Sequence, residues 1–172
     1  MEWIAPEVVR VDQPFVGGER AMLEGWLGWQ RSTLLHKCAG LTGKQLAQRA
    51  VPPSSLSLQG LIRHHADVER SWFRRRFRGE SADPLYYRDD NWDLCFEDVE
   101  PARADAEYAQ LVNEWALADD AVAGAALDDT FVHDKAGTMS LRWIYIHLIE
   151  EYARHNGHAD FLRERIDGAT GY

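Results

Sequence analysis

The sequence LRWIYIHLIEEYARHNGHADFLRERI spans residues 141–166 and has the pattern of one long amphipathic helix. Its apolar side chains recur at helical spacing and form one continuous stripe, which consists of Leu141, Ile144, Leu148, Tyr152, Ala159, Leu162 and Ile166. At about 100° per residue, Glu151 and His155 fall inside this stripe and not at its polar edge. The pattern therefore predicts that one acid and one imidazole point toward the core.

These two side chains lie four residues apart, so they leave successive turns in the same direction and are placed to bind one ion together. A carboxylate in the core of a bundle costs several kcal/mol unless its charge is compensated. A divalent metal ion would compensate it. Two alternatives stay open: an arginine pairs with Glu151, or His155 is an ordinary core histidine. His158 lies one turn further on, at the border of the stripe.

Length, composition and charge narrow the class of protein. The chain of 172 residues has the size of one domain with a substantial core, and a hydrophobic fraction of 45% indicates a globular protein. The net charge of −9 argues against binding to nucleic acid or to anionic membranes. No segment approaches about 18 uninterrupted apolar residues, and the first residues do not resemble a signal peptide. Cys38 and Cys95 are too few for a disulfide framework, so we expect a cytoplasmic protein.

Four long helices are predicted from apolar periodicity and from stop signals. They span residues 19–39, 58–77, 101–124 and 141–166. Residues 1–18 precede them as an irregular N-terminal arm, and residues 19–172 form a single helical domain. Thr42 and Gln45 have the spacing of a capping box, which predicts a short helix over residues 43–49. Ser140 is the expected N-cap of the last helix.

The predicted fold class is all-α, a four-helix bundle, because no segment has a convincing strand pattern. Residues 80–100 form its one long crossover connection, which is either a surface excursion or a lid over a binding site. The aromatic side chains of this connection include Tyr86, Tyr87 and Trp92. A second connection, residues 125–138, has residues of metal-ligand type at Asp128, Asp129, His133 and Asp134. Their spacing is irregular, so we interpret this segment as a solvated loop.

The second predicted helix offers a third ligand, because it contains His64 and His65. By helical angle, His65 lies near the middle of the apolar face, and His64 lies on its flank. The angle favours His65 as the inward-facing group. Helix bundles commonly build metal sites from side chains on facing helices, so a histidine here would complete a site with Glu151 and His155.

Two long motifs stand on the second and fourth predicted helices. They are SLSLQGLIRHHADVERSWF at residues 55–73 and EEYARHNGHADFLRERIDG at residues 150–168. Together with KCAGLT and PPSSLSL, they resemble the DinB-like superfamily of four-helix metalloproteins from about residue 19 to residue 168. The nearest branch is an actinobacterial domain-of-unknown-function group, which is related to mycothiol-dependent maleylpyruvate isomerases and to thiol S-transferases.

Carried over residue by residue, this resemblance implies a metal site made of His64, Glu151 and His155. Many superfamily members have His where this chain has Glu151, whereas the mycothiol-dependent isomerases are similar to it in using Glu. The resemblance places the second-helix ligand at His64 and not at His65, against the helical angle, and we follow the resemblance. His158 is expected to be a neighbour of the site, since many members have Gln there.

A set of two histidines and one glutamate suits zinc first, with nickel or ferrous iron as alternatives, and it leaves a coordination position open. A metal in such a site lowers the pKa of a bound thiol or activates water. The resemblance favours the thiol, so the predicted function is an S-transferase or isomerase that uses mycothiol on an electrophilic small molecule. One alternative is a non-enzymatic metal-binding module that acts as a homodimer in a stress response. Another is a metal-dependent hydrolase.

Further side chains have weaker assignments. Neither Cys38 nor Cys95 is expected to be the nucleophile, because no base is evident beside them. Glu69 and Arg154 lie close in sequence to the expected ligands, so they are candidates for contacts with those ligands or with substrate. Surface ion pairs are the alternative for both.

Overall fold

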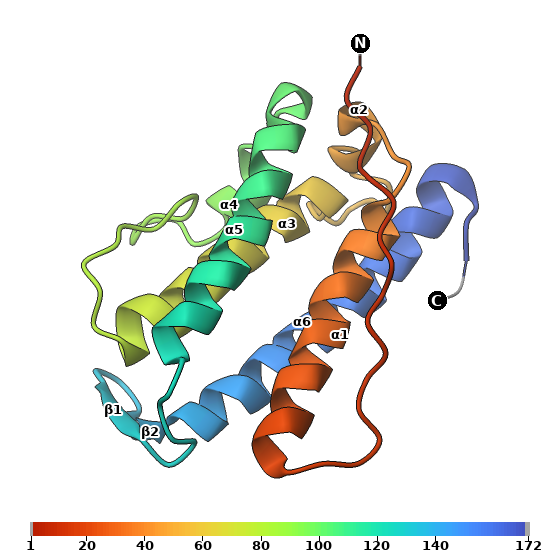
Figure 1. Ribbon diagram of the computed structural model, residues 1–172. Coiled ribbons are helices and arrows are strands. Elements are labelled where there is room, and N and C mark those ends of the chain that lie inside the picture. Colours follow the sequence, from red (N-terminus) through yellow and green to blue (C-terminus); the bar gives the residue numbers. More distant parts are fainter. Residues whose placement is uncertain (1, 171–172) are drawn as a thin grey trace.

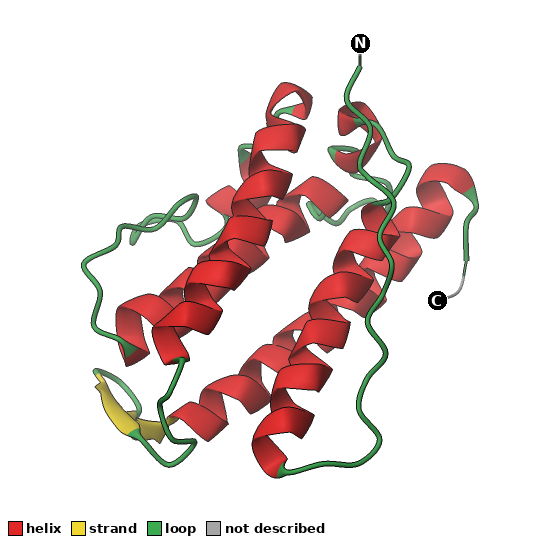
Figure 2. Cartoon of the chain, in the orientation of Figure 1, coloured by secondary structure: helices red, strands yellow, loops and turns green. Residues whose placement is uncertain are grey.

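The computed structural model describes residues 2–170, which form a mostly helical bundle (Figure 1). The elements are α1 (Glu19–Cys38), α2 (Gly43–Leu46), α3 (Leu58–Glu69), η1 (Arg70–Phe77), α4 (Leu94–Glu97), η2 (Pro101–Arg103), α5 (Ala104–Val122), β1 (Thr130–His133), β2 (Gly137–Ser140) and α6 (Leu141–Asp167). The predicted helical bundle is confirmed, with one small hairpin added (Figure 2). Met1, Gly171 and Tyr172, which belong to the predicted arm and domain, lie outside the described residues.

The long helices pack in pairs around one core. α1 lies along α6 and α3 lies along α5, while α3 also contacts α6 (Figure 1). Each of the four contributes a leucine or isoleucine with no exposed surface, namely Leu34, Ile62, Leu111 and Leu148. Because every long helix carries an apolar stripe, the four stripes bury one another.

The last helix, α6, follows its predicted boundaries and orientation. The Ser140 side chain accepts a hydrogen bond from the backbone N–H of Trp143, as an N-cap does. At the other end Gly168 adopts a φ of 80°, a left-handed conformation that glycine takes without strain and that ends the helix. The predicted stripe is the buried face, since Leu141, Ile144, Leu148, Tyr152, Ala159 and Leu162 are all buried.

The second long helix changes its hydrogen-bonding pattern at Arg70, where α3 continues as the π-helix η1. The predicted range of residues 58–77 is confirmed, but the prediction of one uniform helix is wrong. A π-helix joins residues five apart, so it shifts the later side chains around the helix axis. Arg70 and Arg74 both donate to the buried Glu114 of α5, at 2.7 and 2.8 Å. This contact between helices has no signature in the sequence of residues 58–77.

A β-hairpin stands where the sequence predicted an irregular connection. β1 and β2 pair antiparallel, with Phe131 opposite Met139, and Gly137 adopts a φ of 78° at the turn. The prediction that residues 125–138 contain no strand is therefore wrong. Each strand has only four residues, and Phe131 is the one buried side chain in β1, so the alternation that identifies a strand is too short to recognise.

Two acids of this connection have hydrogen-bonding partners in the structure. Asp128 pairs with Arg142, which also pairs with Glu19 at 2.6 Å. Asp129 accepts the backbone N–H of Ala126 at 2.8 Å. Within residues 2–170, the groups of side chains that could hold a metal ion lie on α3 and α6 and not in the hairpin region.

Residues 2–18 run along α1 without forming a helix (Figure 1). Ala5 exchanges backbone hydrogen bonds of 2.9 Å with Gly40 and Leu41. Pro14 lies so close to Gly25 that a Cβ there would stand 2.5 Å from the proline ring, so only glycine fits at this crossing. The arm therefore covers the outer side of α1.

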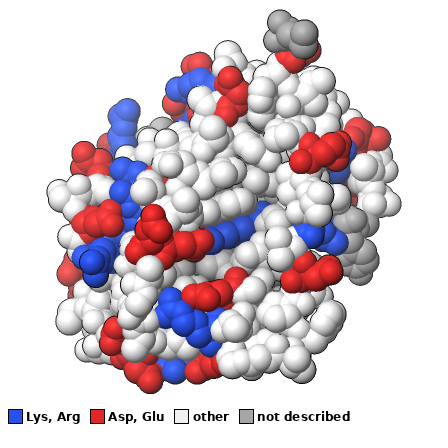
Figure 3. Space-filling view, viewed as in Figure 1, with Lys and Arg blue, Asp and Glu red and all other residues white. Residues whose placement is uncertain are grey.

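The molecular surface carries both signs of charge. On the face drawn in Figure 3, lysine and arginine side chains lie among aspartate and glutamate side chains, and neither sign forms a large separate patch. The net charge of −9 thus does not produce an extended acidic surface on this face. Among residues 2–170, no helix combines the length and the apolarity needed to cross a membrane.

Candidate metal centre

The three predicted ligands lie together between α3 and α6. Nε2 of His64 lies 3.6 Å from Oε2 of Glu151, and Nε2 of His155 lies 3.4 Å from the same oxygen. Each residue offers one ligand atom, and the three atoms all lie within 4.8 Å of one another. The four-residue spacing on α6 aligns two of them, and the packing of α3 against α6 adds the third.

Two of these candidate ligand atoms are buried and have no hydrogen-bond partner among residues 2–170. They are Nε2 of His64 and Oε2 of Glu151. The other carboxylate oxygen of Glu151 accepts a hydrogen bond of 2.8 Å from Arg154. Arg154 therefore neutralises one side of the carboxylate and leaves the side that faces the histidines. Buried polar atoms normally have partners, so the converging lone pairs fit a bound cation.

The protonation state of Glu151 also suits a ligand. The imidazoles of His155 and then of His64, which face this carboxyl, hold its pKa well below its ordinary value, although burial acts in the opposite direction. Its side chain is 14% exposed. The acid is therefore ionised, as a carboxylate that binds a metal must be.

The outer nitrogens of both histidines meet further side chains. Nδ1 of His64 lies 3.9 Å from Sγ of Cys95. Nδ1 of His155 lies 3.3 Å from Nδ1 of His158. A histidine that offers the Nε2 lone pair to a metal carries its hydrogen on Nδ1, so it would donate to these neighbours. The neighbours then fix the orientation of each ring.

The contact with His64 corrects one prediction about Cys95, because an imidazole does lie beside this thiol. Burial nevertheless raises the pKa of the Cys95 thiol to about 12, and burial raises that of Cys38 to about 12 as well. Neither sulfur is a thiolate near neutral pH, so the expectation that neither cysteine is the nucleophile keeps its physical basis.

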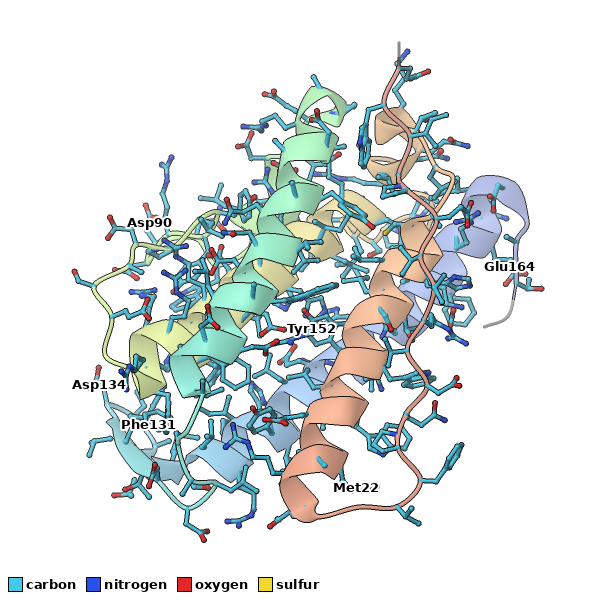
Figure 4. The ribbon with its side chains drawn as sticks, in the orientation of Figure 1. Met22, Asp90, Phe131, Asp134, Tyr152 and Glu164 are labelled. Atoms are coloured by element: carbon cyan, nitrogen blue, oxygen red, sulfur yellow. The ribbon has the colours of Figure 1, made fainter. Side chains whose placement is uncertain are left out.

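His65 lies behind the three candidate ligands. It has no exposed surface, as its helical angle predicted, and its ring stacks on Tyr152 with 3.8 Å between centroids. The Tyr152 hydroxyl donates to Glu69, whose two oxygens each accept 2.7 Å hydrogen bonds from Arg31. Glu69 is thus part of a buried ionic pair, and Tyr152 links this pair to His65. Figure 4 labels Tyr152, whose side chain lies in the interior of the bundle.

A second group of metal-ligand type overlaps the first on α6. It consists of His147, Glu150 and Glu151. The nitrogens of His147 lie 3.9 Å from one oxygen of each acid. His147 and Glu150 contribute no buried atom without a partner among the residues described, and Glu150 is exposed, so this group gives weaker support for an ion. The spacing of residues 147, 151 and 155 contained the signal for His147, which our sequence analysis missed.

A pocket of about 320 Å³ adjoins the candidate centre at His64. The helical segment α3–η1 forms one wall, and residues 87–96 of the long connection form the other. Tyr87 and Trp92 line this pocket and stack on each other with 4.6 Å between ring centroids. Tyr86, in contrast, lies over the guanidinium of Arg63 and lines a different cavity.

Asp67 holds the long connection against this helix. Its carboxylate accepts backbone N–H groups from Leu85, Tyr86 and Tyr87 at 2.6, 2.8 and 3.1 Å. Burial raises the pKa of Asp67, while these three hydrogen bonds act against that rise. The connection is therefore fastened to α3 one turn from His64, and it lines the pocket beside the candidate centre.

The sequence was also compared with known proteins. A search of curated proteins finds no match. A family model described as Mycothiol-S-transferase matches residues 22–168, which include most of α1, both motifs and all of α6. The match covers most of the chain and all three candidate ligands. The chain therefore belongs to the mycothiol-S-transferase family, within the DinB-like superfamily.

Proposed function

We propose that His64, Glu151 and His155 bind one divalent metal ion, preferably zinc, and that the protein transfers mycothiol to an electrophilic small molecule. The observation that carries the metal proposal is the buried Oε2 of Glu151, which has no hydrogen-bond partner among residues 2–170 and faces two imidazole nitrogens. Membership of the mycothiol-S-transferase family supports mycothiol as the thiol substrate. A site with two nitrogens and one oxygen suits zinc, while nickel and ferrous iron remain alternatives.

The protein side chains prepare this site before a thiol arrives. Arg154 holds one oxygen of Glu151, so the other oxygen keeps its direction toward the histidines. In the tautomer that binds a metal, the outer nitrogens of the two histidines donate to Cys95 and His158, and the inner nitrogens carry no proton. When bound, the metal offers an open position at which a thiol loses its proton near neutral pH.

The transfer itself joins the thiol sulfur to a carbon of the electrophile. With a chlorinated substrate, the carbon–chlorine bond breaks and chloride leaves with the bonding electron pair, while the thiol proton goes to solvent. The pocket beside His64 is open to the electrophile, and its aromatic walls exclude part of the solvent. The protein thus contributes proximity and orientation as well as the metal ligands.

Metal analysis of the purified protein tests the first half of the proposal. We expect about one metal ion per chain in the wild type and in His36→Ala, a matched control on α1, but loss of metal in His155→Ala. Equal trace metal in all three proteins would refute the site. Turnover of a chlorinated aromatic compound with added mycothiol tests the second half. A metal-loaded protein that consumes no thiol would favour the non-enzymatic module.

A further inference from the structure

The pocket beside His64 extends along one side of the second long helix. Its lining passes from His64 through Val68 and Ser71 to Arg76, and residues 87–96 close the opposite side. Ser71 lies seven residues beyond His64, so the two lie about 10 Å apart along the helix axis. A molecule of one ring can span this distance once the thiol sulfur occupies the end nearest His64.

The middle of the pocket is lined by flat aromatic rings. Trp72 contributes from η1, while Trp92 and Phe96 contribute from the long connection. Phe96 also stacks on His64, with 5.3 Å between ring centroids. Trp92 is 58% exposed although it stacks on Tyr87, so much of an indole surface is free to contact a ligand. Such walls favour a planar apolar body.

Arg76 closes the far end of the pocket, and the nearby Asp134 attracts its charge without forming a salt bridge with it. Its guanidinium lies over the Trp72 ring at 4.6 Å and donates to the Ser71 hydroxyl, but it forms no salt bridge within residues 2–170. Its neighbours differ, because Arg70 and Arg74 both bind Glu114. Burial lowers the pKa of Arg76, while attraction to Tyr87 and Asp134 acts in the opposite direction.

The acids that line the same pocket are not placed to neutralise Arg76. The Asp67 carboxylate is occupied by three backbone N–H groups, and Asp93 is exposed to solvent. A guanidinium has five N–H donors and binds carboxylates in a planar, two-point geometry. The unused donors of Arg76 therefore suit an anionic group on a ligand.

The π-helical segment directs the Arg76 guanidinium toward the pocket. Backbone hydrogen bonds in a π-helix join residues five apart, so Arg76 comes to lie over Ser71. In a regular α-helix the two residues would point in directions about 140° apart, given about 100° per residue. The change of helix type thus moves Arg76 into the pocket.

We propose that this pocket binds the electrophile and selects planar, single-ring compounds that carry a carboxylate opposite the reacting carbon. The ring lies among Trp72, Trp92 and Phe96, and Arg76 binds the carboxylate. This inference rests on the proposed thiol transfer and names the class of its second substrate. In the reaction with a chlorodinitrobenzoate, the sulfur–carbon bond forms, the carbon–chlorine bond breaks, chloride takes the electron pair and the thiol proton goes to solvent.

The test compares a chlorodinitrobenzoate with its neutral amide, which has the same reacting carbon. In Arg76→Gln we expect kcat/KM for the carboxylate to fall about tenfold or more, because one charge-assisted contact is lost. The value of kcat/KM for the amide should change less than about twofold. Arg76→Lys should retain part of the preference because it retains the charge. Arg78→Gln removes an exposed charge two residues away and should leave kcat/KM unchanged for both substrates.

A binding measurement separates this inference from the proposed function. Calorimetric titration with dinitrobenzoate, which has no leaving group, should show weaker binding to Arg76→Gln than to the wild type, whether or not metal is present. Equal losses for carboxylate and amide, or an equal loss in Arg78→Gln, would overturn the inference while thiol transfer stands. Arg76-dependent binding without transfer to either electrophile would instead refute the proposed function.

Discussion

The ring of Tyr152 lies parallel to the ring of His65, with centroids 3.8 Å apart and 10° between the planes. On its other side, the Tyr152 hydroxyl donates to Glu69 at 3.0 Å. His65 in turn touches the rings of His64 and His155 edge-on, at 5.3 and 5.2 Å. One tyrosine therefore connects the buried ionic pair of the core to the candidate metal centre.

Replacing Tyr152 tests which part of this side chain matters. Tyr152→Phe keeps the ring but leaves Trp115 without the acceptor of its 2.8 Å hydrogen bond, so we expect a loss of about 1–3 kcal/mol in the free energy of unfolding and unchanged metal content. Tyr152→Ala removes the ring as well and should cost about 3–5 kcal/mol and also reduce metal affinity. Urea unfolding and metal titration measure both effects. Metal loss in Tyr152→Phe would contradict this assignment.

The pair of Arg31 and Glu69 should show strong coupling. Glu69→Leu leaves a buried guanidinium with the exposed Asp119 as its remaining acidic partner among residues 2–170, so we expect destabilisation of about 3–5 kcal/mol. The double variant with Arg31→Met removes both charges and should recover most of the loss. Denaturant unfolding of the single and double variants gives the coupling energy. Additive losses would show that the two groups act independently.

An exposed ion pair provides the comparison for the buried pair of Arg31 and Glu69. Arg20 and Glu24 lie one turn apart on α1 with side chains 33% and 48% exposed. Because solvent screens such a pair, Glu24→Gln should change the free energy of unfolding by no more than about 0.5 kcal/mol. A similar loss in Glu24→Gln and Glu69→Leu would mean that burial does not determine the effect.

Cys95 should influence metal affinity through His64. Cys95→Ala removes the acceptor beside Nδ1 of His64, so we expect metal affinity to fall about tenfold or more, as for other groups that orient a ligand. Cys38→Ala is the matched control, because Cys38 is also buried but lies at the C-terminal end of α1. Competition with a chromophoric chelator measures both affinities. The same decrease in both variants would exclude a specific role for Cys95.

Asp67 should hold the long connection in place. In Asp67→Asn only one side-chain oxygen remains, so at least one of the three backbone N–H groups loses its acceptor, at a cost of about 1–3 kcal/mol. Hydrogen exchange at Leu85 and Tyr86 should accelerate more than elsewhere. Asp90→Asn, at an exposed position at the edge of Figure 4, should leave exchange unchanged. Unaltered exchange in Asp67→Asn would show that other contacts hold this segment.

The amino-acid sequence determined the features that depend on local periodicity. The stripe on residues 141–166 placed Glu151 and His155 on the inner face of a helix, because helical geometry alone fixes which side chains share a direction. The same reasoning found the boundaries of the four long helices to within a few residues. Motif resemblance, and not the helical angle, favoured His64 over His65.

Only the tertiary structure decided the features that depend on contacts between distant segments. The π-helix at Arg70 accompanies two hydrogen bonds to Glu114 on another helix, and this change of register carries Arg76 into the pocket beside His64. The periodicity of apolar residues within one helix does not indicate such pairings, because the partners are separated by about forty residues. Each of these charged side chains is also of a type that is usually exposed on a helix. Which atoms converge is set by how the helices pack, and packing minimises the free energy of the whole chain.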